Sequence, residues 1–207
     1  MRSVFLDVAE LESGATFEHE QVVIVLPFID QALARRVESV LSRRALCDGL
    51  LVLVDDSLRL GFIKVANLIF AHSRSKYFGY LAQDVFPGDG WLRAALETLD
   101  ESGADLLPFS DGRFYGNIAT FGLLRRSWAR SLYHNFVFYP EYQSHFGDTE
   151  ISAIAWAQGR AIFNPGCIMC EVDYEKHTRK NNAADEALYR ARARTGFNGL
   201  IAPFDPD

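Results

Sequence analysis

The sequence has few cysteines, no long apolar run and no excess of basic residues. Its three cysteines, Cys47, Cys167 and Cys170, form an odd set, which does not fit a disulfide framework. No apolar run reaches the roughly 18 residues that a membrane-spanning helix needs, and residues 1–12 lack the basic flank and apolar stretch of a signal peptide. We therefore expect a soluble, cytoplasmic protein with at most peripheral membrane contact.

The charge and the cysteine spacing exclude two further classes. A formal net charge of -6 argues against a nucleic-acid partner, because binding to a phosphate backbone needs clustered Lys and Arg. The pair Cys167 and Cys170 has the spacing of half a zinc site, but no second pair exists, so we interpret both as core residues. A chain of 207 residues with 49% hydrophobic content suits one globular domain, residues 1–207, with a full-sized core.

Apolar runs that alternate with helical periodicity predict a doubly wound α/β domain. The β-branched run Gln21–Phe28 is typical of a buried parallel strand, and Asp30 can cap the helix after it. Further strands are expected at Ser3–Val8, Gly49–Val54, Tyr77–Leu81, Asp105–Phe109, Ile118–Leu124, Ala161–Phe163 and Cys167–Val172. Further helices are expected from Leu60, from Trp91, over Arg125–Tyr133, from Ile151 and over Ala184–Arg194. We interpret the three arginines of the Arg125–Tyr133 helix as a solvated face rather than a phosphate clamp.

Acidic residues follow two of the predicted strands. Asp55 and Asp56 come directly after the strand Gly49–Val54, and Asp84 follows the strand that ends near Leu81. Ligands of open α/β sheets bind at the carboxyl ends of the strands. These carboxylates therefore mark a candidate site.

A third acidic cluster, Asp148 to Glu150, precedes a helical pattern. Helix capping explains this cluster as well as catalysis does, because Asp148 or Thr149 is a good N-cap and Glu150 favours the positive end of the helix dipole. Both interpretations stay open at this point.

Five segments resemble family 2, GT-A-type glycosyltransferases, in order from about Val22 to about Tyr189. The first strand of that family is similar to VVIVLPFID, and its second strand, with the acidic pair that receives the nucleotide base, is similar to LLVLVDDS. Its helix leading into the metal-site strand is similar to GFIKVANLIFAHSRSKYFGYL. Its DXD-like metal motif, followed by a proline and a Trp-Leu helix start, is similar to LAQDVFPGDGWL. Its Glu-Asp motif, which supplies the catalytic base, is similar to HFGDTEIS. The resemblance implies a Rossmann-like mixed sheet with helices on both faces.

The resemblance also implies an activity and a set of site residues. A sugar would move with inversion from a nucleotide-sugar donor to a hydroxyl acceptor, a glycan or lipid-linked saccharide in bacterial surface-glycan synthesis. Asp148 would be the general base, with Glu150 as the second candidate. Trp91 and Tyr142 are candidate acceptor contacts, although aromatic residues more often belong to the core. The implied nucleotide-binding residues are Pro27, Asp30, Asp55, Asp56, Lys64, Asn67 and Gln83.

A divalent cation, Mn2+ or Mg2+, is implied as cofactor, because the diphosphate leaving group develops negative charge and hard cations prefer carboxylate oxygens. Asp84 would be its principal ligand. A further ligand is expected after the strand Cys167–Val172, where His177 and Asp173 are both available. A solvated loop explains these two residues equally well.

The sequence departs from the family pattern at three places. The DXD-like site reads Ala82-Gln83-Asp84, which leaves one carboxylate. Some family members that resemble rhamnosyltransferases also carry Gln-Asp there, so the resemblance favours a deoxyhexose donor. The link Ser57–Phe62 is only six residues long, and Gly147 stands where the family often has Glu. A degenerate nucleotide- or sugar-binding protein of the same fold therefore remains the alternative. A nucleotidyltransferase is disfavoured, because no glycine-rich loop follows the first strand.

Overall fold

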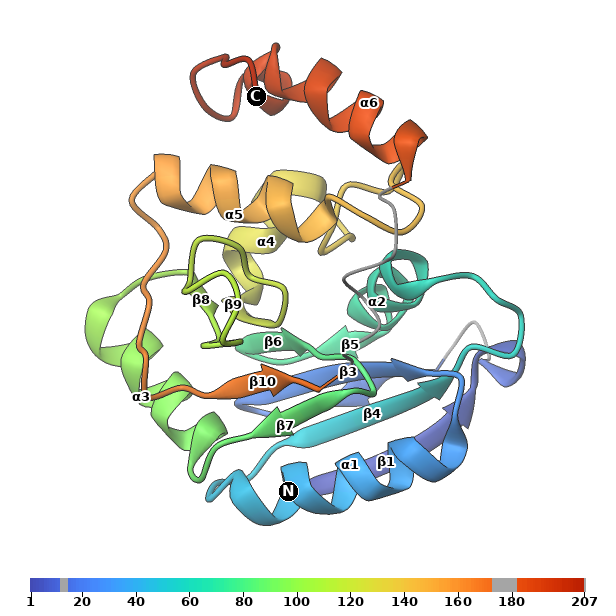
Figure 1. Cartoon of the computed structure of the whole chain (residues 1–207). Helices are drawn as coiled ribbons and strands as arrows, with labels where there is room; N and C mark the ends of the chain where they lie inside the picture. Colours follow the sequence, from blue (N-terminus) through green and yellow to red (C-terminus); the bar gives the residue numbers. More distant parts are fainter. Residues whose placement is uncertain (12–14, 173–181, 207) are drawn as a thin grey trace.

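A six-stranded sheet forms the centre of the molecule (Figure 1). The computed structural model describes residues 1–11, 15–172 and 182–206. The strand order is β1-β4-β3-β6-β9-β8. The bounds of these strands are Arg2–Asp7 (β1), Leu50–Asp55 (β4), Val22–Phe28 (β3), Tyr77–Tyr80 (β6), Gly122–Arg125 (β9) and Leu106–Pro108 (β8).

The sheet is mixed. Strands β1, β4, β3 and β6 are parallel to one another, β9 is antiparallel to β6, and β8 is antiparallel to β9. All seven residues of β3 are buried, as expected for a strand covered on both faces. The predicted α/β class and the mixed Rossmann-like sheet are therefore confirmed.

Helices cover both faces of this sheet. Alternate residues of β3 point to opposite sides, so Ile24 packs in the core beneath α1 and α3, whereas Val25 packs in the core beneath α2, α4 and α5. Helix α6 lies outside α5 (Figure 1). The helices are α1 (Gln31–Arg44), α2 (Phe62–Ala71), α3 (Trp91–Ser102), α4 (Arg126–Tyr133), α5 (Gly147–Ala157), α6 (Ala183–Ala193) and α7 (Gly196–Gly199), with a short 3-10 helix η1 (Val8–Glu10).

Two small ribbons complete the fold. Strand β7 (Val85–Pro87) pairs antiparallel with β10 (Met169–Glu171), and β2 (Phe17–Glu18) pairs in parallel with β5 (Ser73–Arg74). Val85 of β7 and Met169 of β10 are buried in the same hydrophobic core as α1 and α3, so the ribbon packs on that side of the main sheet. The sequence predicted no strand between Asp84 and the Trp91 helix, whereas β7 forms there because the distant strand β10 pairs with it.

The structure differs from the prediction at one strand and at the start of two other elements. The strand expected over Ala161–Phe163 is reduced to one isolated bridge between Leu106 and Ala161, and β9 begins only at Gly122. Asp30 caps α1 as predicted, accepting a hydrogen bond of 3.0 Å from the Leu33 amide. The N-cap of α5 is neither Asp148 nor Thr149 but Phe146, whose φ of 68° ends the preceding segment in the left-handed region.

Two features noted in the sequence, its cysteines and its apolar runs, can be compared with the structure. All three cysteines are free thiols, Cys167 is buried, and the other two are half-buried. Across the described part of the chain, no helix combines the length and the apolar character that crossing a bilayer requires.

Candidate active site

The carboxyl ends of β3, β4 and β6 meet at one edge of the sheet. The last residue of β3, Phe28, lies opposite Asp55 in the register, and the backbone amide of Asp56 donates a hydrogen bond of 2.9 Å to the Phe28 carbonyl. The Leu81 amide donates to the Val25 carbonyl at 2.9 Å, which extends β6 along β3. The predicted nucleotide and metal segments therefore lie side by side, at the position where open α/β sheets bind ligands.

Gln83 fixes the loop between β3 and α1. Its Oε1 accepts hydrogen bonds from the amides of Ile29 (2.9 Å) and Asp30 (3.1 Å). Asp30 uses its own carboxylate to cap α1, and Pro27 is buried within β3. The structure thus brings these three predicted nucleotide-binding residues together, with the side chains of Gln83 and Asp30 bonded to backbone amides.

The two adjacent aspartates at the end of β4 have different environments. Asp56 is buried, and its carboxylate accepts hydrogen bonds from the amides of Leu60 (2.7 Å) and Gly61 (2.8 Å), which shapes the short link before α2. Asp55 is half-buried, and within the described residues its carboxylate has no hydrogen-bond partner. Of the pair, Asp55 is therefore the carboxylate available to a ligand, and Asp56 is the residue that forms the turn.

Lys64 and Asn67 lie one turn apart on α2 but have different surroundings. Lys64 is exposed. Asn67 is buried, where its amide nitrogen donates to the Phe138 carbonyl at 3.0 Å and its oxygen accepts from the amides of Val137 (3.0 Å) and Phe138 (2.9 Å). All polar atoms of Asn67 are therefore used to hold the irregular segment before α5, which contradicts its predicted contact with a nucleotide.

Substitutions at these two positions should separate folding from binding. We expect Asn67→Ala to lower the free energy of unfolding by about 3 kcal/mol, because it strands two buried amides and a carbonyl. We expect Lys64→Ala to change it by less than about 0.5 kcal/mol, as at other exposed positions. Urea unfolding of both variants measures the difference. Equal stability of the two variants would contradict the assignment of Asn67.

The first turn of α5 carries Asp148 against α2 and β6. A Cβ added at Gly147 would lie 3.2 Å from Cδ1 of Ile63, so the two helix starts are in contact. The Ser152 hydroxyl donates to the Asp148 carbonyl at 2.6 Å and accepts from the Ala119 amide at 2.8 Å. The Ala119 carbonyl in turn accepts from the hydroxyl of Tyr80 at 2.8 Å, which joins the start of α5 to the end of β6. Burial and then the charge of Asp148 raise the pKa of Tyr80. The Asp148 carboxylate accepts a hydrogen bond of 2.8 Å from the Thr149 amide, and burial raises its own pKa.

Glu150 is a structural residue, which contradicts its prediction as a second candidate base. Its side chain is completely buried and forms an ion pair with Arg192, whose Nη2 lies 2.6 Å from Oε1 and whose Nε lies 2.8 Å from Oε2. The hydroxyls of Tyr133 and Tyr142 donate to the same carboxylate at 2.6 Å and 2.7 Å. No acceptor hydroxyl can reach an atom that is this enclosed.

The two aromatic acceptor contacts are also core residues. Tyr142 is fully buried beside Glu150. Trp91 is 1% exposed, and its indole nitrogen donates to the Leu41 carbonyl at 3.1 Å. Neither ring presents a face to a sugar, so the acceptor prediction was wrong for both.

Asp84 lies between β6 and β7 and is half-buried. Its backbone carbonyl accepts a hydrogen bond of 2.9 Å from the Val172 amide, which joins the end of β10 to this position. The predicted ligands His177 and Asp173 fall outside the described residues. Within the described ranges, no three His, Cys, Asp or Glu side chains are grouped closely enough to hold a metal ion. The carboxylate of Asp84 is a suitable oxygen donor for Mn2+ or Mg2+, but it supplies only one ligand.

Sequence reasoning missed Asp185, near the start of α6. Its carboxylate accepts hydrogen bonds from three consecutive backbone amides, those of Gln143 (2.9 Å), Ser144 (2.8 Å) and His145 (2.8 Å). A Cβ added at Gly61 would lie 3.2 Å from the Gln143 carbonyl oxygen, so the loop that Asp185 holds rests on the start of α2. No local signal marks Asp185, because its partners are about 40 residues away in sequence.

The sequence matches no protein-family profile and no curated protein. Solved structures do share its architecture. S. aureus TarS in complex with UDP-GlcNAc is 13% identical, with a TM-score of 0.63 over 84% of this chain and 66% of that chain. The mannosyltransferase PcManGT from Pyrobaculum calidifontis, in complex with GDP-Man and Mn2+, is 14% identical, with a TM-score of 0.61 over 90% of this chain and 66% of that chain.

This chain covers only part of those proteins. A second TarS structure has a TM-score of 0.62 and 11% identity, and the match spans 39% of its length. Sequence identities this low show a shared fold. The ligands in those structures are ligands of those proteins. The mixed sheet with helices on both faces is the fold that this chain shares with these glycosyltransferases.

Proposed function

We propose that this protein is a glycosyltransferase that moves a sugar from a nucleotide-sugar donor to a hydroxyl acceptor, with inversion at the anomeric carbon. The observation that supports the proposal is that Asp55 and Asp84 follow β4 and β6, the two strands that flank β3, while the start of α5, which carries Asp148, packs against the start of α2, in a fold shared with glycosyltransferases. In this proposal the acceptor belongs to a bacterial surface glycan or is a lipid-linked saccharide.

Each residue has a role that follows from its environment. The accessible carboxylate of Asp55 accepts a hydrogen bond from the nucleotide base, and exposed Lys64, on the first turn of α2, contacts the phosphates. Asp84 would hold a divalent cation, which would stabilise the charge on the diphosphate leaving group. Gln83, Asp56 and Asn67 fix the loops on which these residues stand.

Asp148 removes the proton from the acceptor hydroxyl. Burial raises its pKa, and a base with a raised pKa accepts a proton more readily than an ordinary aspartate does. Because a single displacement needs one base and no covalent intermediate, one carboxylate in this position is sufficient. The burial of Glu150 leaves Asp148 as the candidate base in this helix turn.

A non-catalytic nucleotide- or sugar-binding protein is the second candidate. The single carboxylate of Ala82-Gln83-Asp84 favours it, because Gln83, which stands beside Asp84, is bonded to the Ile29 and Asp30 amides. The two candidates differ in turnover and not in donor binding.

Donor binding is tested by thermal shift with a panel of UDP-, GDP- and dTDP-sugars, with and without Mn2+. A ligand that binds only the folded state raises the melting temperature. We expect one donor class to do so in a Mn2+-dependent manner, and we expect Asp84→Asn to abolish the Mn2+ dependence while the unliganded protein keeps its melting temperature.

Asp89→Asn is the matched control, because Asp89 is 83% exposed on the turn after β7. It should respond to the donor as the parent does. If no donor shifts the parent, or if Asp84→Asn responds like the parent, the proposed donor site is wrong. Release of the nucleotide in the presence of acceptor glycans then distinguishes a transferase from a binding protein.

A further inference from the structure

A cationic cavity opens at the edge of the sheet opposite the candidate active site. Its volume is about 330 Å³, and its polar lining consists of Ser73, Arg74, Ser75, Arg126, Arg130 and Asn135. The Arg126 amide donates a hydrogen bond of 3.0 Å to the carbonyl of Lys76, the residue before β6 begins. The cavity therefore lies where the parallel strands start, whereas Asp55 and Asp84 lie where they end.

Arg126 is held in this cavity by neutral groups. Its guanidinium donates to the Ser73 hydroxyl at 2.9 Å and to the Phe70 carbonyl, and it stacks on the Phe70 ring at 4.1 Å from the ring centre. Burial and then the charge of Arg130 lower the pKa of Arg126 to about 10. The guanidinium is thus half-buried and fixed in place, with a second cation beside it.

Arg130 lies one turn further along α4, on the same helix face as Arg126. Neither side chain forms an ion pair within the part of the chain that the structure describes. Arg74, the third arginine, has an exposed partner in Glu18 at 3.6 Å, a pair that water screens. Arg126 and Arg130 are like charges at a spacing where they repel each other. Because neither is paired with a carboxylate among the described residues, the cavity has an uncompensated positive charge in a protein whose net charge is -6.

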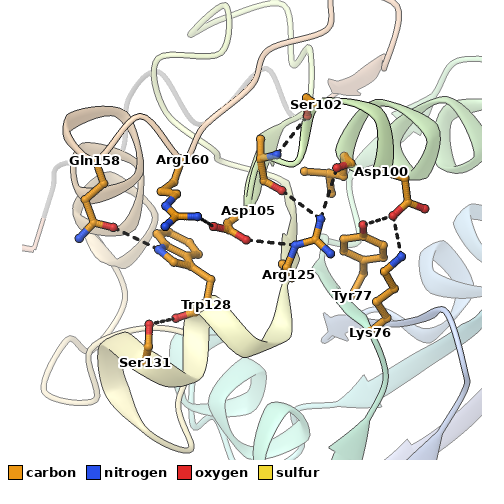
Figure 2. Close-up of polar contacts among 12 residues, drawn as sticks. Lys76, Tyr77, Asp100, Ser102, Asp105, Arg125, Trp128, Ser131, Gln158 and Arg160 are labelled. Atoms are coloured by element: carbon orange, nitrogen blue, oxygen red, sulfur yellow. Dashed lines mark hydrogen bonds and ion pairs between the residues drawn. The ribbon is translucent and has the colours of Figure 1, made fainter.

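The neighbouring arginine, Arg125, has a structural role and is paired with a carboxylate (Figure 2). Its Nε lies 3.1 Å from the buried carboxylate of Asp105, which also pairs with Arg160 at 3.0 Å. Its Nη2 donates to the carbonyls of Leu99 (3.4 Å) and Ala104 (3.5 Å). The prediction of a solvated face is therefore wrong for Arg125, whose charge is neutralised by Asp105. It is also wrong for Arg126, which is half-buried in the cavity.

We infer that this cavity is a binding site for a phosphoryl group, with Arg126 and Arg130 as its cationic contacts. Guanidinium groups match phosphate oxygens in charge and geometry, and the side-chain amide of Asn135 can donate to a remaining oxygen. The phosphoryl group belongs either to a soluble phosphate or to a phospholipid headgroup. The site is separate from the proposed donor site, so either can exist without the other.

Calorimetric titration with inorganic pyrophosphate at low ionic strength tests the inference. We expect the parent to bind and Arg130→Glu to lose at least about tenfold in affinity, because a charge-assisted contact is replaced by repulsion. Arg126→Gln should lose a similar amount. Arg130 is exposed, so its variant folds even if Arg126→Gln does not. Arg36→Glu, the same charge change on the exposed side of α1, is the matched control and should bind as the parent does.

A second arm separates the two sources of phosphate. Co-sedimentation with vesicles of phosphatidylcholine, with or without phosphatidylglycerol, reports headgroup binding, and Arg130→Glu should abolish any anion-dependent binding that Arg36→Glu retains. Absence of binding to both pyrophosphate and anionic vesicles overturns the inference. So does equal loss in Arg36→Glu, which indicates general charge attraction, or parent affinity in Arg130→Glu, which places the anion elsewhere.

Discussion

Replacing Glu150 by alanine should lower the free energy of unfolding by about 3 to 5 kcal/mol, the range for breaking a buried ion pair from one side. The variant leaves the Arg192 guanidinium buried without its carboxylate, and the hydroxyls of Tyr133 and Tyr142 lose their acceptor. Urea unfolding measures this loss, and the melting temperature should fall by about 10 °C.

The control for this experiment is Glu186→Ala on α6. Glu186 also pairs with an arginine, Arg190, at 3.1 Å, but both partners are 40% exposed. An exposed pair at this spacing contributes about 0.3 to 0.5 kcal/mol, so the control should be nearly as stable as the parent. Glu150 lies on α5 and Arg192 on α6. If Glu150→Ala costs no more than this control, the buried pair does not stabilise the packing of these two helices.

Replacing Asp148 by asparagine should lower turnover about 10²-fold or more, while donor binding and the melting temperature change little. The amide keeps the size of the side chain and an acceptor oxygen for the Thr149 amide, but it cannot take a proton. Since Phe146 and not Asp148 is the N-cap of α5, loss of capping cannot explain a loss of activity. Asp205→Asn, 71% exposed at the far end of the chain, serves as the matched control.

The pH profile gives an independent measure of the same role. Burial raises the pKa of Asp148, and the base works only when deprotonated. Turnover should therefore fall as the pH drops through a value above the ordinary aspartate pKa of about 3.9. Full activity of Asp148→Asn, or a parent whose turnover keeps its level down to pH 4, would contradict the assignment.

Local pattern was sufficient for the main sheet and most helices. The continuous apolar run of β3 reflects burial on both faces of the strand. The helical spacing after Trp91 reflects burial on one face of α3. Both patterns are visible in the sequence. Strand β7 was missed because Val85–Pro87 owes its conformation to β10, a partner that no local window contains. Residues Ala161–Phe163 are apolar but find only one bridging position, so composition alone overstated them.

The candidate site was predicted by position better than by role. Sequence placed carboxylates and amides at the ends of β4 and β6, and the structure brings them together there. It could not separate Asp55 from Asp56, or Lys64 from Asn67, because a carboxylate or an amide serves equally well as a ligand contact or as an acceptor for backbone amides. Which of these applies depends on the approach of distant segments, such as residues 137–138 toward Asn67.

The hydrogen bonds from the amides of residues 143–145 to Asp185 have a consequence for folding during synthesis. The loop that leads into Asp148 acquires its backbone partner only when a residue about 40 positions later has left the ribosome. At about 5 to 20 residues per second, this interval is roughly 2 to 8 seconds. During that time β3, β4 and β6 can already pair, because all their residues have been translated. A nascent chain stalled before Asp185 should therefore have an ordered sheet and an unfinished loop around Asp148.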